Sequence, residues 1–445
     1  MYDEEKKLFL PDRFIVGICP KCKSEDQYGD SCEKCGATYN PTELINPKSA
    51  LSGKQPIKMK SDHHFFTLSD KRCVDFLKEW LRDSTKLQVE ALNKVNEWLE
   101  LDIEGKSKLV DWDISRDAPY FGFLIPETSD KYFYVWLDAP IGYYAGLMDW
   151  CNKNDKDFNE YVSPNSEIDQ IHFIGKDILY FHSLFWPAMC HFSGFRTPTS
   201  IFTHGFLTIN GKKMSKSKGT FITAGDYIDS NINPEFLRYY LSSKLNGSME
   251  DLDLNLSEFV QKINVDLVGK YINILSRCSG FIHKFFESSL MTTEEINKLC
   301  GRKNYLENFI DNKIDLIFNA YLSRNTSKVL RELIYLTDKV NSFIHENKPW
   351  EISKNLSPSN KKELENLHLI LSISIRCFAK LTIMLKPVLP KLCEKIEKDV
   401  FKIKKPWQWK DVGSVKINKL GKVKHLITRI QDQDLKNLLP EKENV

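Results

Sequence analysis

The stretch that most constrains the fold is residues 131–220, where strand-like and helix-like patterns alternate. Tyr132–Trp150 begins as a strand and continues as a helix, Gln170–Gly175 is a second strand, and Ser200–Asn210 is a third. A helix is predicted after the second strand, with Asp177 at its N-cap. Strands that are separated by helices usually pair in parallel, because the chain crosses back over the sheet between them. The order therefore predicts part of a parallel α/β sheet.

A basic loop, Gly211–Thr220, follows the last of these strands and reads Gly-Lys-Lys-Met-Ser-Lys-Ser-Lys-Gly-Thr. Its two glycines can adopt positive φ angles, so the loop can bend tightly and bring its amides close to a ligand. Four lysines without a carboxylate among them repel one another unless an anion is bound, and a polyphosphate is a suitable anion. The chain has no G-x-x-x-x-G-K-[ST] loop, so a bound nucleotide would have to use this one. A solvated basic turn is the alternative.

Two C-x-x-C turns lie within residues 1–57, where regular periodicity is weak. Their cysteines are Cys19, Cys22, Cys32 and Cys35. Two such turns let four thiolates surround one zinc ion, and the metal supplies folding energy that a small apolar set cannot. A site closed by four cysteines is structural rather than catalytic. A redox pair or unliganded thiols are the alternatives.

The C-terminal part of the chain is predicted to be an all-α bundle. Asn233-Pro234-Glu235 has the cap and first-turn residues of a helix start. Asn255 and Glu258 form a variant of a capping box, which opens a long helix ending near Phe286. The other helical patterns span 84–100 earlier in the chain and 303–323, 326–347 and 360–386 later.

Length and composition bound the class of protein. A chain of 445 residues is too long for one core, and a net charge of +3 excludes a histone-like polycation. Any nucleic-acid surface must therefore be a local patch. The sequence has neither an apolar run of about 18 residues nor a signal-peptide pattern at its start. Its 11 cysteines, clustered only near the start, suit a reducing cytosol better than a disulfide framework. We therefore expect a cytoplasmic protein without a membrane segment.

The run Lys213-Met214-Ser215-Lys216-Ser217 resembles the second signature of the class I aminoacyl-tRNA synthetases. Together with the cysteine turns and the residues named below, it makes essentially all of residues 1–430 similar to the methionyl-tRNA synthetases of the bacterial zinc-knuckle type. The resemblance implies an α/β plus all-α fold. In it, the second half of a Rossmann-like catalytic domain carries a zinc-knuckle insertion and is followed by a helical anticodon-binding bundle.

Two sets of residues with helical spacing are candidates for an amino-acid site. By spacing alone, each set indicates either core packing or an aromatic pocket around a thioether. The resemblance implies that they bind methionine. These residues are Trp136, Ala139, Pro140, Tyr143, Ile178, His182 and Trp186.

For the nucleotide, the resemblance implies ATP binding by Lys213, Lys216 and Asp177 and catalysis by Lys213, Lys216 and Arg116. Lys216 would neutralise charge that builds on the β- and γ-phosphates, assisted by Lys213. Arg116 stands in Trp112–Pro119, a dense polar segment that matches the family's re-entry into the catalytic domain.

Four residues of the bundle match the positions that read the CAU anticodon in the family. Asn273 and Arg277 are four residues apart, so they share a helix face, and Pro349-Trp350 is predicted to close a later helix. An arginine that bonds a base edge and a tryptophan that stacks on a splayed base suit single-stranded RNA. Ordinary surface polarity and a helix-end packing residue are the alternatives.

The resemblance also implies five parts in this chain. They are the remainder of the inserted domain with its zinc knuckle (1–120), the second half of the catalytic domain (121–205), the lysine loop and stem-contact region (206–256), the anticodon-binding domain (257–400) and a tail that packs back on the catalytic domain (401–445). The family's first signature, a His-Ile-Gly-His type tetrapeptide, has no counterpart in the sequence. We therefore expect the first half of the catalytic domain to be missing.

The implied activity is that of a methionine–tRNA ligase, which serves translation initiation and elongation. Its partners would be L-methionine, ATP with Mg²⁺, and tRNA(Met), with one structural Zn²⁺ per chain. Because a C-terminal dimerisation domain found in many bacterial relatives has no counterpart here, we expect a monomer. The alternative is a truncated, non-catalytic remnant that binds zinc and the anticodon.

Overall fold

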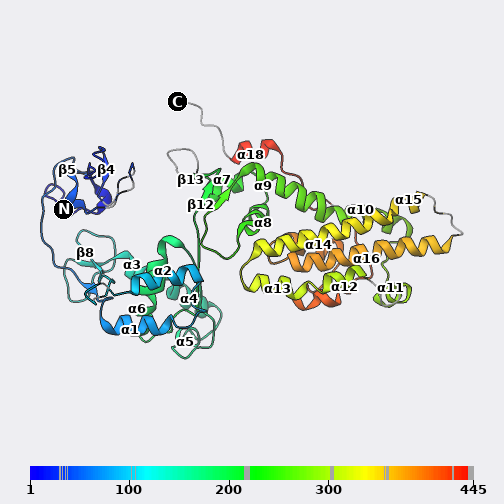
Figure 1. Ribbon diagram of the computed structural model, residues 1–445, viewed down its shortest axis with the longest axis horizontal. Coiled ribbons are helices and arrows are strands. Elements are labelled where there is room, and N and C mark those ends of the chain that lie inside the picture. The colour runs from blue at the N-terminus through cyan, green and yellow to red at the C-terminus, as the bar shows by residue number, and fades with distance from the viewer. Residues whose placement is uncertain are drawn as a thin grey trace. The chain divides into compact units, whose positions relative to one another are not determined.

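The computed structural model describes the chain except for residues 30, 31, 33, 36, 38, 102, 106, 215–220, 301–304, 355, 357–359, 423, 424 and 439–445; for 213, 432, 436 and 437 it describes the backbone alone. The described residues form two compact units, Met1–Thr203 and His204–Val445. Figure 1 colours the first from blue to green and the second from green to red.

The first unit begins with short antiparallel strands. β1 (Tyr2–Asp3) pairs with β2 (Leu8–Phe9). A three-stranded sheet with the order β4-β3-β5 follows, and it carries the cysteine turns. Its strands are β3 (Ile15–Ile18), β4 (Gln27–Tyr28) and β5 (Ile45–Ser49). Two further antiparallel pairs are β6 (Phe65–Phe66) with β7 (Trp112–Asp113), and β8 (Ser115–Asp117) with β9 (Lys131–Phe133).

The predicted parallel α/β element is formed by β10 (Ile171–Gly175) and β11 (Ser200–His204). The N–H of Thr199 donates to the carbonyl of Gln170 at 2.8 Å, so both strands start at the same end of the sheet. A continuous helical segment connects them. It consists of a 3₁₀ turn (Lys176–Ile178), a π-helical stretch (Phe181–Phe185) and α6 (Trp186–Phe192).

The prediction that Asp177 caps this segment is wrong. The extended residue at the N-cap position is Gly175, with φ −76° and ψ 154°, and helical geometry begins at Lys176. Asp177 therefore lies inside the first turn, and its carboxylate folds back over Gly175, where a Cβ would meet Oδ1 at 2.5 Å.

The remaining helices of the first unit are α1 (Lys71–Trp80), α2 (Val89–Leu99), α3 (Val135–Asp138), α4 (Ile141–Lys153) and α5 (Asn159–Val162). α2 begins later than the predicted position 84. Leu87 forms a parallel bridge with Ile201, and the side-chain amide of Gln88 bonds both the N–H (2.6 Å) and the carbonyl (3.0 Å) of Thr203. This segment extends the sheet, so its backbone does not enter the helix.

The second unit opens with a small sheet in the order β13-β12-β14. β12 (Leu207–Ile209) is antiparallel to β13 (Lys212–Lys213) and parallel to β14 (Leu252–Leu254). The strand predicted over Ser200–Asn210 is therefore two strands in different sheets. It is interrupted at Gly205, whose Cβ would lie 2.1 Å from the carbonyl of Glu250, so only glycine permits this approach.

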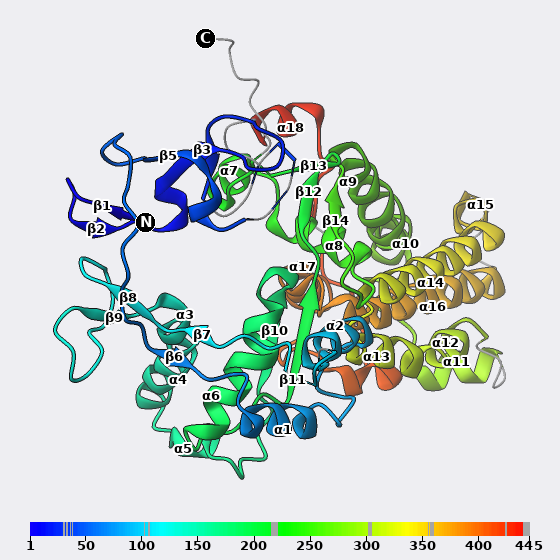
Figure 2. The same ribbon diagram turned by 60° about the vertical axis from the view of Figure 1, so that its left-hand side comes forward.

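The helical bundle of the second unit is built around two long helices, α14 (Thr326–Asn347) and α16 (Lys361–Leu385), which run side by side in Figures 1 and 2. The other elements after β13 are α7 (Ala224–Asp229), α8 (Pro234–Lys244), α9 (Leu256–Lys262), a π-helical stretch (Ile263–Tyr271), α10 (Ile272–Phe285), α11 (Thr293–Cys300), α12 (Tyr305–Asp311), α13 (Ile314–Leu322), α15 (Pro349–Lys354), α17 (Pro390–Lys395), a π-helical turn (Ile396–Val400), a 3₁₀ helix (Trp409–Ser414) and α18 (Asp432–Leu438).

The two predicted helix caps at Asn233 and Asn255 are confirmed. The side chain of Asn233 accepts from the N–H of Glu235, and that of Asn255 accepts from the N–H of Glu258 at 2.9 Å. The prediction of one continuous helix over 303–323 is wrong, because the helix breaks at residues 312–313. The two parts are α12 and α13. Pro349 opens α15 rather than closing a helix, after Lys348 turns the chain with φ 43°.

α16 is the only helix among the described residues that is long and apolar enough to cross a membrane by composition. Of its most apolar window, 89% is buried inside the bundle. Leu371, Ile375 and Phe378 on this helix have no measurable exposure. α16 is therefore buried as a core helix is, and this burial explains its apolar composition.

Candidate functional sites

Four of the predicted methionine-binding residues come together in the first unit. The hydroxyl of Tyr143 on α4 lies 3.0 Å from Nε2 of His182, and Nδ1 of His182 lies 3.0 Å from the carbonyl of Ile178. Because a carbonyl only accepts, Nδ1 carries the proton, and Nε2 accepts from the hydroxyl. Burial lowers the pKa of His182, which keeps the ring neutral. The rings of Tyr143 and Trp186 meet edge to face at 6.2 Å.

The other three members of this set lie in α3 and at the start of α4. Trp136 stacks on Phe181 with ring centres 4.3 Å apart and planes 16° apart. Ala139 is exposed, and Pro140 next to it is buried. The set thus spans buried, half-buried and exposed positions rather than one uniformly buried face.

His172 on β10 belongs to the same cluster and was not predicted as a site residue. Its ring centre lies 5.4 Å from that of Tyr143, 5.8 Å from His182 and 6.5 Å from Trp186. Burial lowers the pKa of His172 to about 4, and its Nε2 has no hydrogen-bond partner in the described part of the chain. In β10 the apolar neighbours Ile171 and Phe173 are exposed while His172 is buried, so the apolar pattern of this strand could not point to it.

Arg116 is held in place on β8. Its Nη1 donates to Oδ2 of Asp113 at 3.0 Å and to the carbonyl of Ser115 at 2.6 Å. The guanidinium carbon lies 3.8 Å from the ring centre of Tyr134, which is a cation–π contact. One third of the Arg116 side chain remains exposed, so its outer donors can reach an anion.

The lysine loop begins at a hairpin between β12 and β13. Asn210 and Gly211 have φ angles of 49° and 73°, as an Asn-Gly two-residue turn requires, which confirms a positive φ at Gly211. The N–H of Gly211 donates to Oδ1 of Asp253 at 2.7 Å, which fixes the turn to β14. Lys213 lies in β13, and Lys216 is outside the described residues.

Two of the four predicted anticodon-reading residues touch. The guanidinium carbon of Arg277 on α10 lies 4.9 Å from the ring centre of Trp350 on α15. Asn273 is one turn earlier on α10 and lines a neighbouring groove of about 540 Å³ with Ser276. Pro349 is buried and Trp350 is half-buried, so part of the indole packs on the bundle and part faces solvent.

The four cysteines of the N-terminal turns converge, with their sulfur atoms all within 4.8 Å of one another. Cys19 Sγ lies 3.9 Å from Cys35 Sγ, and Cys22 Sγ lies 3.5 Å from Cys32 Sγ. Sulfurs at the corners of a tetrahedron around zinc would be about 3.8 Å apart, given a Zn–S bond of about 2.3 Å. The cluster could therefore hold one metal ion.

A family model described as "tRNA synthetases class I (M)" matches residues 1–279, which is more than half of the chain. The chain belongs to this family. Methionine–tRNA ligase of Nitrosomonas eutropha is 52% identical over 442 residues, covering 98% of this chain and 62% of that protein. The ligase of Nitrosomonas europaea is 50% identical and is covered to 62% as well. This chain thus spans about three fifths of the length of these relatives.

The class I synthetase fold is also supported by solved structures. Methionyl-tRNA synthetase of Mycobacterium tuberculosis in complex with methionyl-adenylate superimposes with a TM-score of 0.69, covering 88% of this chain and 74% of that one. The identity is 20%, so this comparison supports the fold alone.

Proposed function

We propose that the protein is a methionine–tRNA ligase and that this chain supplies its methionine-, tRNA- and zinc-binding residues. The observation that carries the proposal is the identity of about 50% to methionine–tRNA ligases over 98% of the chain. We also infer that it acts in the cytoplasm, where its tRNA substrate is used in translation.

In the proposed amino-acid site, Tyr143, His182 and Trp186 surround the methionine side chain, with Trp136, Ala139, Pro140 and Ile178 completing the walls. The geometry supports this role. Aromatic edges and faces make favourable contacts with a thioether sulfur, and the neutral His182 ring adds no charge that an apolar side chain would have to desolvate.

The proposed reaction has two steps. A carboxylate oxygen of methionine attacks the α-phosphorus of ATP, the bond to the bridging oxygen breaks, and pyrophosphate leaves. A hydroxyl of the terminal adenosine of the tRNA then attacks the carbonyl carbon, and AMP leaves. Lys213 and Lys216 would hold the β- and γ-phosphates, Arg116 would stabilise developing negative charge, and Asp177 would contact the nucleotide. Positioning and charge stabilisation carry most of such catalysis.

For tRNA, we propose that Arg277 and Asn273 bond base edges of the anticodon and that Trp350, seated on Pro349, stacks on an unpaired base. The contact between Arg277 and Trp350 supports this, because it presents a cation and an exposed ring edge side by side. The four cysteines would hold one structural Zn²⁺, which would fix the N-terminal turns. Mg²⁺ would enter with ATP.

The test combines two measurements on this chain. Methionine-dependent ATP–pyrophosphate exchange, with zinc and magnesium present, reports the first step. Binding of an anticodon stem-loop that contains CAU, compared with one that does not, reports tRNA recognition. Trp350→Ala should weaken stem-loop binding by about tenfold and leave exchange unchanged, since stacking on one base contributes about 1–3 kcal/mol.

The alternative is a remnant that binds zinc and the anticodon without catalysis. Exchange that stays absent in the full-length protein, with stem-loop binding retained, would favour it over a ligase. Lys216→Ala in the intact enzyme separates the roles further, because the proposal requires a loss of exchange with stem-loop binding retained. Equal losses of both would remove the role that we assign to Lys216.

A further inference from the structure

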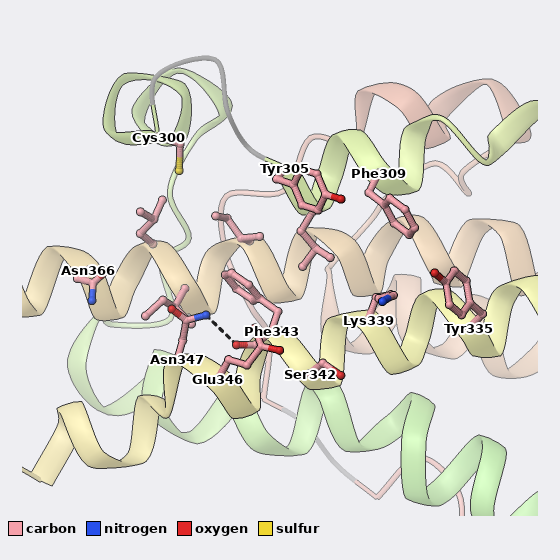
Figure 3. A pocket seen from close by; sticks show the side chains of 14 residues that line it. Cys300, Tyr305, Phe309, Tyr335, Lys339, Ser342, Phe343, Glu346, Asn347 and Asn366 are labelled. Atoms are coloured by element: carbon pink, nitrogen blue, oxygen red, sulfur yellow. Dashed lines mark hydrogen bonds between the residues drawn. The ribbon is translucent and has the colours of Figure 1, made fainter.

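The bundle contains a cavity of about 600 Å³ between α12, α14 and α16 (Figure 3). Its polar side chains, such as Lys339 and Glu346 on α14 and Asn366 on α16, do not converge on one point. A binding site needs a few polar groups that converge on its ligand, so this lining does not identify a ligand. The polar side chains around His63 in the first unit do converge, and none of the roles proposed above explains that histidine.

The hydroxyl of Ser115 on β8 lies at the centre of the cluster around His63, and Ser115 is fully buried. The hydroxyl donates to Oδ1 of Asp113 at 3.1 Å and accepts from the N–H of His64 at 2.9 Å. Nδ1 of His63 lies 2.9 Å from the same hydroxyl oxygen. A hydroxyl has one proton, and here that proton goes to Asp113, so the oxygen can only accept from His63. Nδ1 of His63 therefore carries a proton.

The same nitrogen connects His63 to Arg116. Nδ1 of His63 lies 3.3 Å from Oδ2 of Asp113, and this carboxylate oxygen accepts from Nη1 of Arg116 at 3.0 Å. The backbone keeps the histidine at this place, because the N–H of Ile114 donates to the carbonyl of His64 at 2.9 Å. One carboxylate oxygen thus receives both the ring of His63 and the guanidinium of Arg116.

The other ring nitrogen of His63 faces a second carboxylate. Nε2 lies 3.5 Å from Oδ2 of Asp117, whose Oδ1 accepts from the hydroxyl of Ser61 at 2.7 Å and from the ammonium of Lys131. Burial raises the pKa of Asp117, but the bonds from Lys131 and Ser61 outweigh burial, so the pKa lies below its usual value and the carboxylate stays charged. This charge fixes the far side of the ring, so His63 contacts Asp113 from a defined position.

A serine, a histidine and an aspartate in contact also occur in hydrolases, but this cluster is arranged differently. A nucleophilic serine has to be accessible and has to give its proton to the histidine. Ser115 is fully buried, and its proton goes to Asp113. The cluster therefore supports a role in holding neighbouring side chains and not one in covalent chemistry.

We propose that His63 is a positioning residue for Arg116 and that it acts through Asp113. Its effect on catalysis rests on the ligase function proposed above, whereas the contact itself does not. With the ring in place, Oδ1 of Asp113 is held by Ser115 and Oδ2 by His63, so the carboxylate presents a fixed acceptor to Nη1 of Arg116. Without the ring, Oδ2 loses this contact and the carboxylate can turn, so the guanidinium adopts more orientations.

The first test measures Arg116 itself and requires no enzyme activity. Phenylglyoxal modifies guanidinium groups, and its reaction with Arg116 in this chain can be followed by peptide mass spectrometry. In His63→Ala the reaction should be at least about threefold faster, as expected when one weak hydrogen bond no longer holds the group in place. His64→Ala, a change at the exposed neighbouring side chain, is the matched control and should leave the rate unchanged. An unchanged or slower reaction of Arg116 in His63→Ala would overturn the proposal.

Two amide variants separate positioning from simple packing. The side-chain N–H₂ of asparagine can replace the Nδ1 donor, whereas that of the longer glutamine can replace Nε2. His63→Asn should therefore keep the modification of Arg116 near the parental rate, and His63→Gln should resemble His63→Ala. If glutamine restored the rate as well as asparagine does, the histidine would act by filling space and the proposal would fail.

In the intact enzyme, ATP–pyrophosphate exchange reports the consequence for catalysis. His63→Ala should lower kcat by about tenfold with little change in the KM for methionine, because a loosely held Arg116 stabilises less charge in the transition state. His63→Asn should recover most of this loss. A raised KM with an unchanged kcat would contradict the positioning role. If the parent enzyme shows no exchange, the proposed ligase function fails, and faster modification of Arg116 in His63→Ala still supports the contact.

Discussion

His172 makes the stability of the first unit depend on pH between neutrality and pH 4. The ring is buried, and the groups that face it are Tyr143 from α4 and His182 and Trp186 from the following helical segment. None of these is a carboxylate, so no described group in contact with the ring compensates a proton on His172. A folded pKa below the unfolded one means that the unfolded chain binds the proton more readily. Stability is therefore full above about pH 6.5 and is lost as the pH falls toward 4.

The size of the effect follows from the two pKa values. Burial lowers the pKa of His172 from 6.5 to about 4. Linkage then assigns to this one ring a loss of about 2 kcal/mol in the free energy of unfolding between pH 7.5 and pH 5, and about 3 kcal/mol below pH 4. Since whole domains are stable by about 5–15 kcal/mol, a loss of 2 kcal/mol is readily measured.

The assay is urea unfolding at pH 7.5 and pH 5.0, with hydrogen exchange of the β10 peptide reporting on this unit alone. His172→Phe keeps a ring of similar size but cannot titrate, so its pH-dependent loss should be smaller than that of the parent by about 2 kcal/mol. His64→Gln, a change at an exposed histidine of the same unit, is the matched control and should lose as much as the parent.

Two results would refute this reasoning. One is an equal pH-dependent loss in His172→Phe and the parent. The other is a His172 resonance that titrates near 6.5 in NMR spectra of the folded protein. Either would mean that a group or a solvent molecule near Nε2 stabilises the charged ring.

Three further predictions concern other parts of the chain. Chelation of the metal proposed for the four cysteines should increase hydrogen exchange over residues 15–49 while α14 and α16 stay protected. Uniform protection throughout would show that the cysteine turns fold without metal. The buried carboxylate of Glu307 pairs with two cations, Arg376 (Nε to Oε1, 2.8 Å) and Lys380 (Nζ to Oε2, 3.6 Å). Glu307→Gln removes this shared carboxylate, so the bundle should lose about 3 kcal/mol of stability in urea unfolding. The same change at the exposed Glu294 should cost little. Hydrogen bonds from the hydroxyls of Ser49 and Ser52 hold the pKa of Asp3 at about 2. Strands β1 and β5 should therefore lose stability as the pH falls from about 4 to about 2. In an NMR titration of the strand amides, Asp3→Asn should remove that pH dependence.

The long helices could be predicted from the sequence because their signals are local. α14 and α16 match the predicted ranges to within one residue at each end. The 3.6-residue period of apolar positions depends only on the helix itself, and the cap residues Asn233 and Asn255 bond backbone groups two or three residues away. Such determinants require no knowledge of what packs against the helix.

Where the prediction failed, a distant partner decided the structure. The helix predicted from position 84 starts late because Leu87 and Gln88 pair with β11, more than 100 residues further along the chain. The strand before the lysine loop is interrupted because Gly205 approaches the backbone of Glu250. Neither contact leaves a periodic trace in the sequence, so propensity and pattern could not reveal it.

The candidate amino-acid site shows how far a helical pattern can be interpreted. Its spacing alone favoured core packing over a binding site, and the two interpretations differ in burial rather than in sequence. Trp186 is 2% exposed and His182 1%, as core residues would be, but Tyr143, which contacts both, is 47% exposed. A core would bury the tyrosine ring as well, whereas a ligand site requires one wall that remains open until the ligand arrives. The exposure of Tyr143 beside a buried histidine and tryptophan therefore favours a binding site, and a pattern of residue types alone could not have shown it.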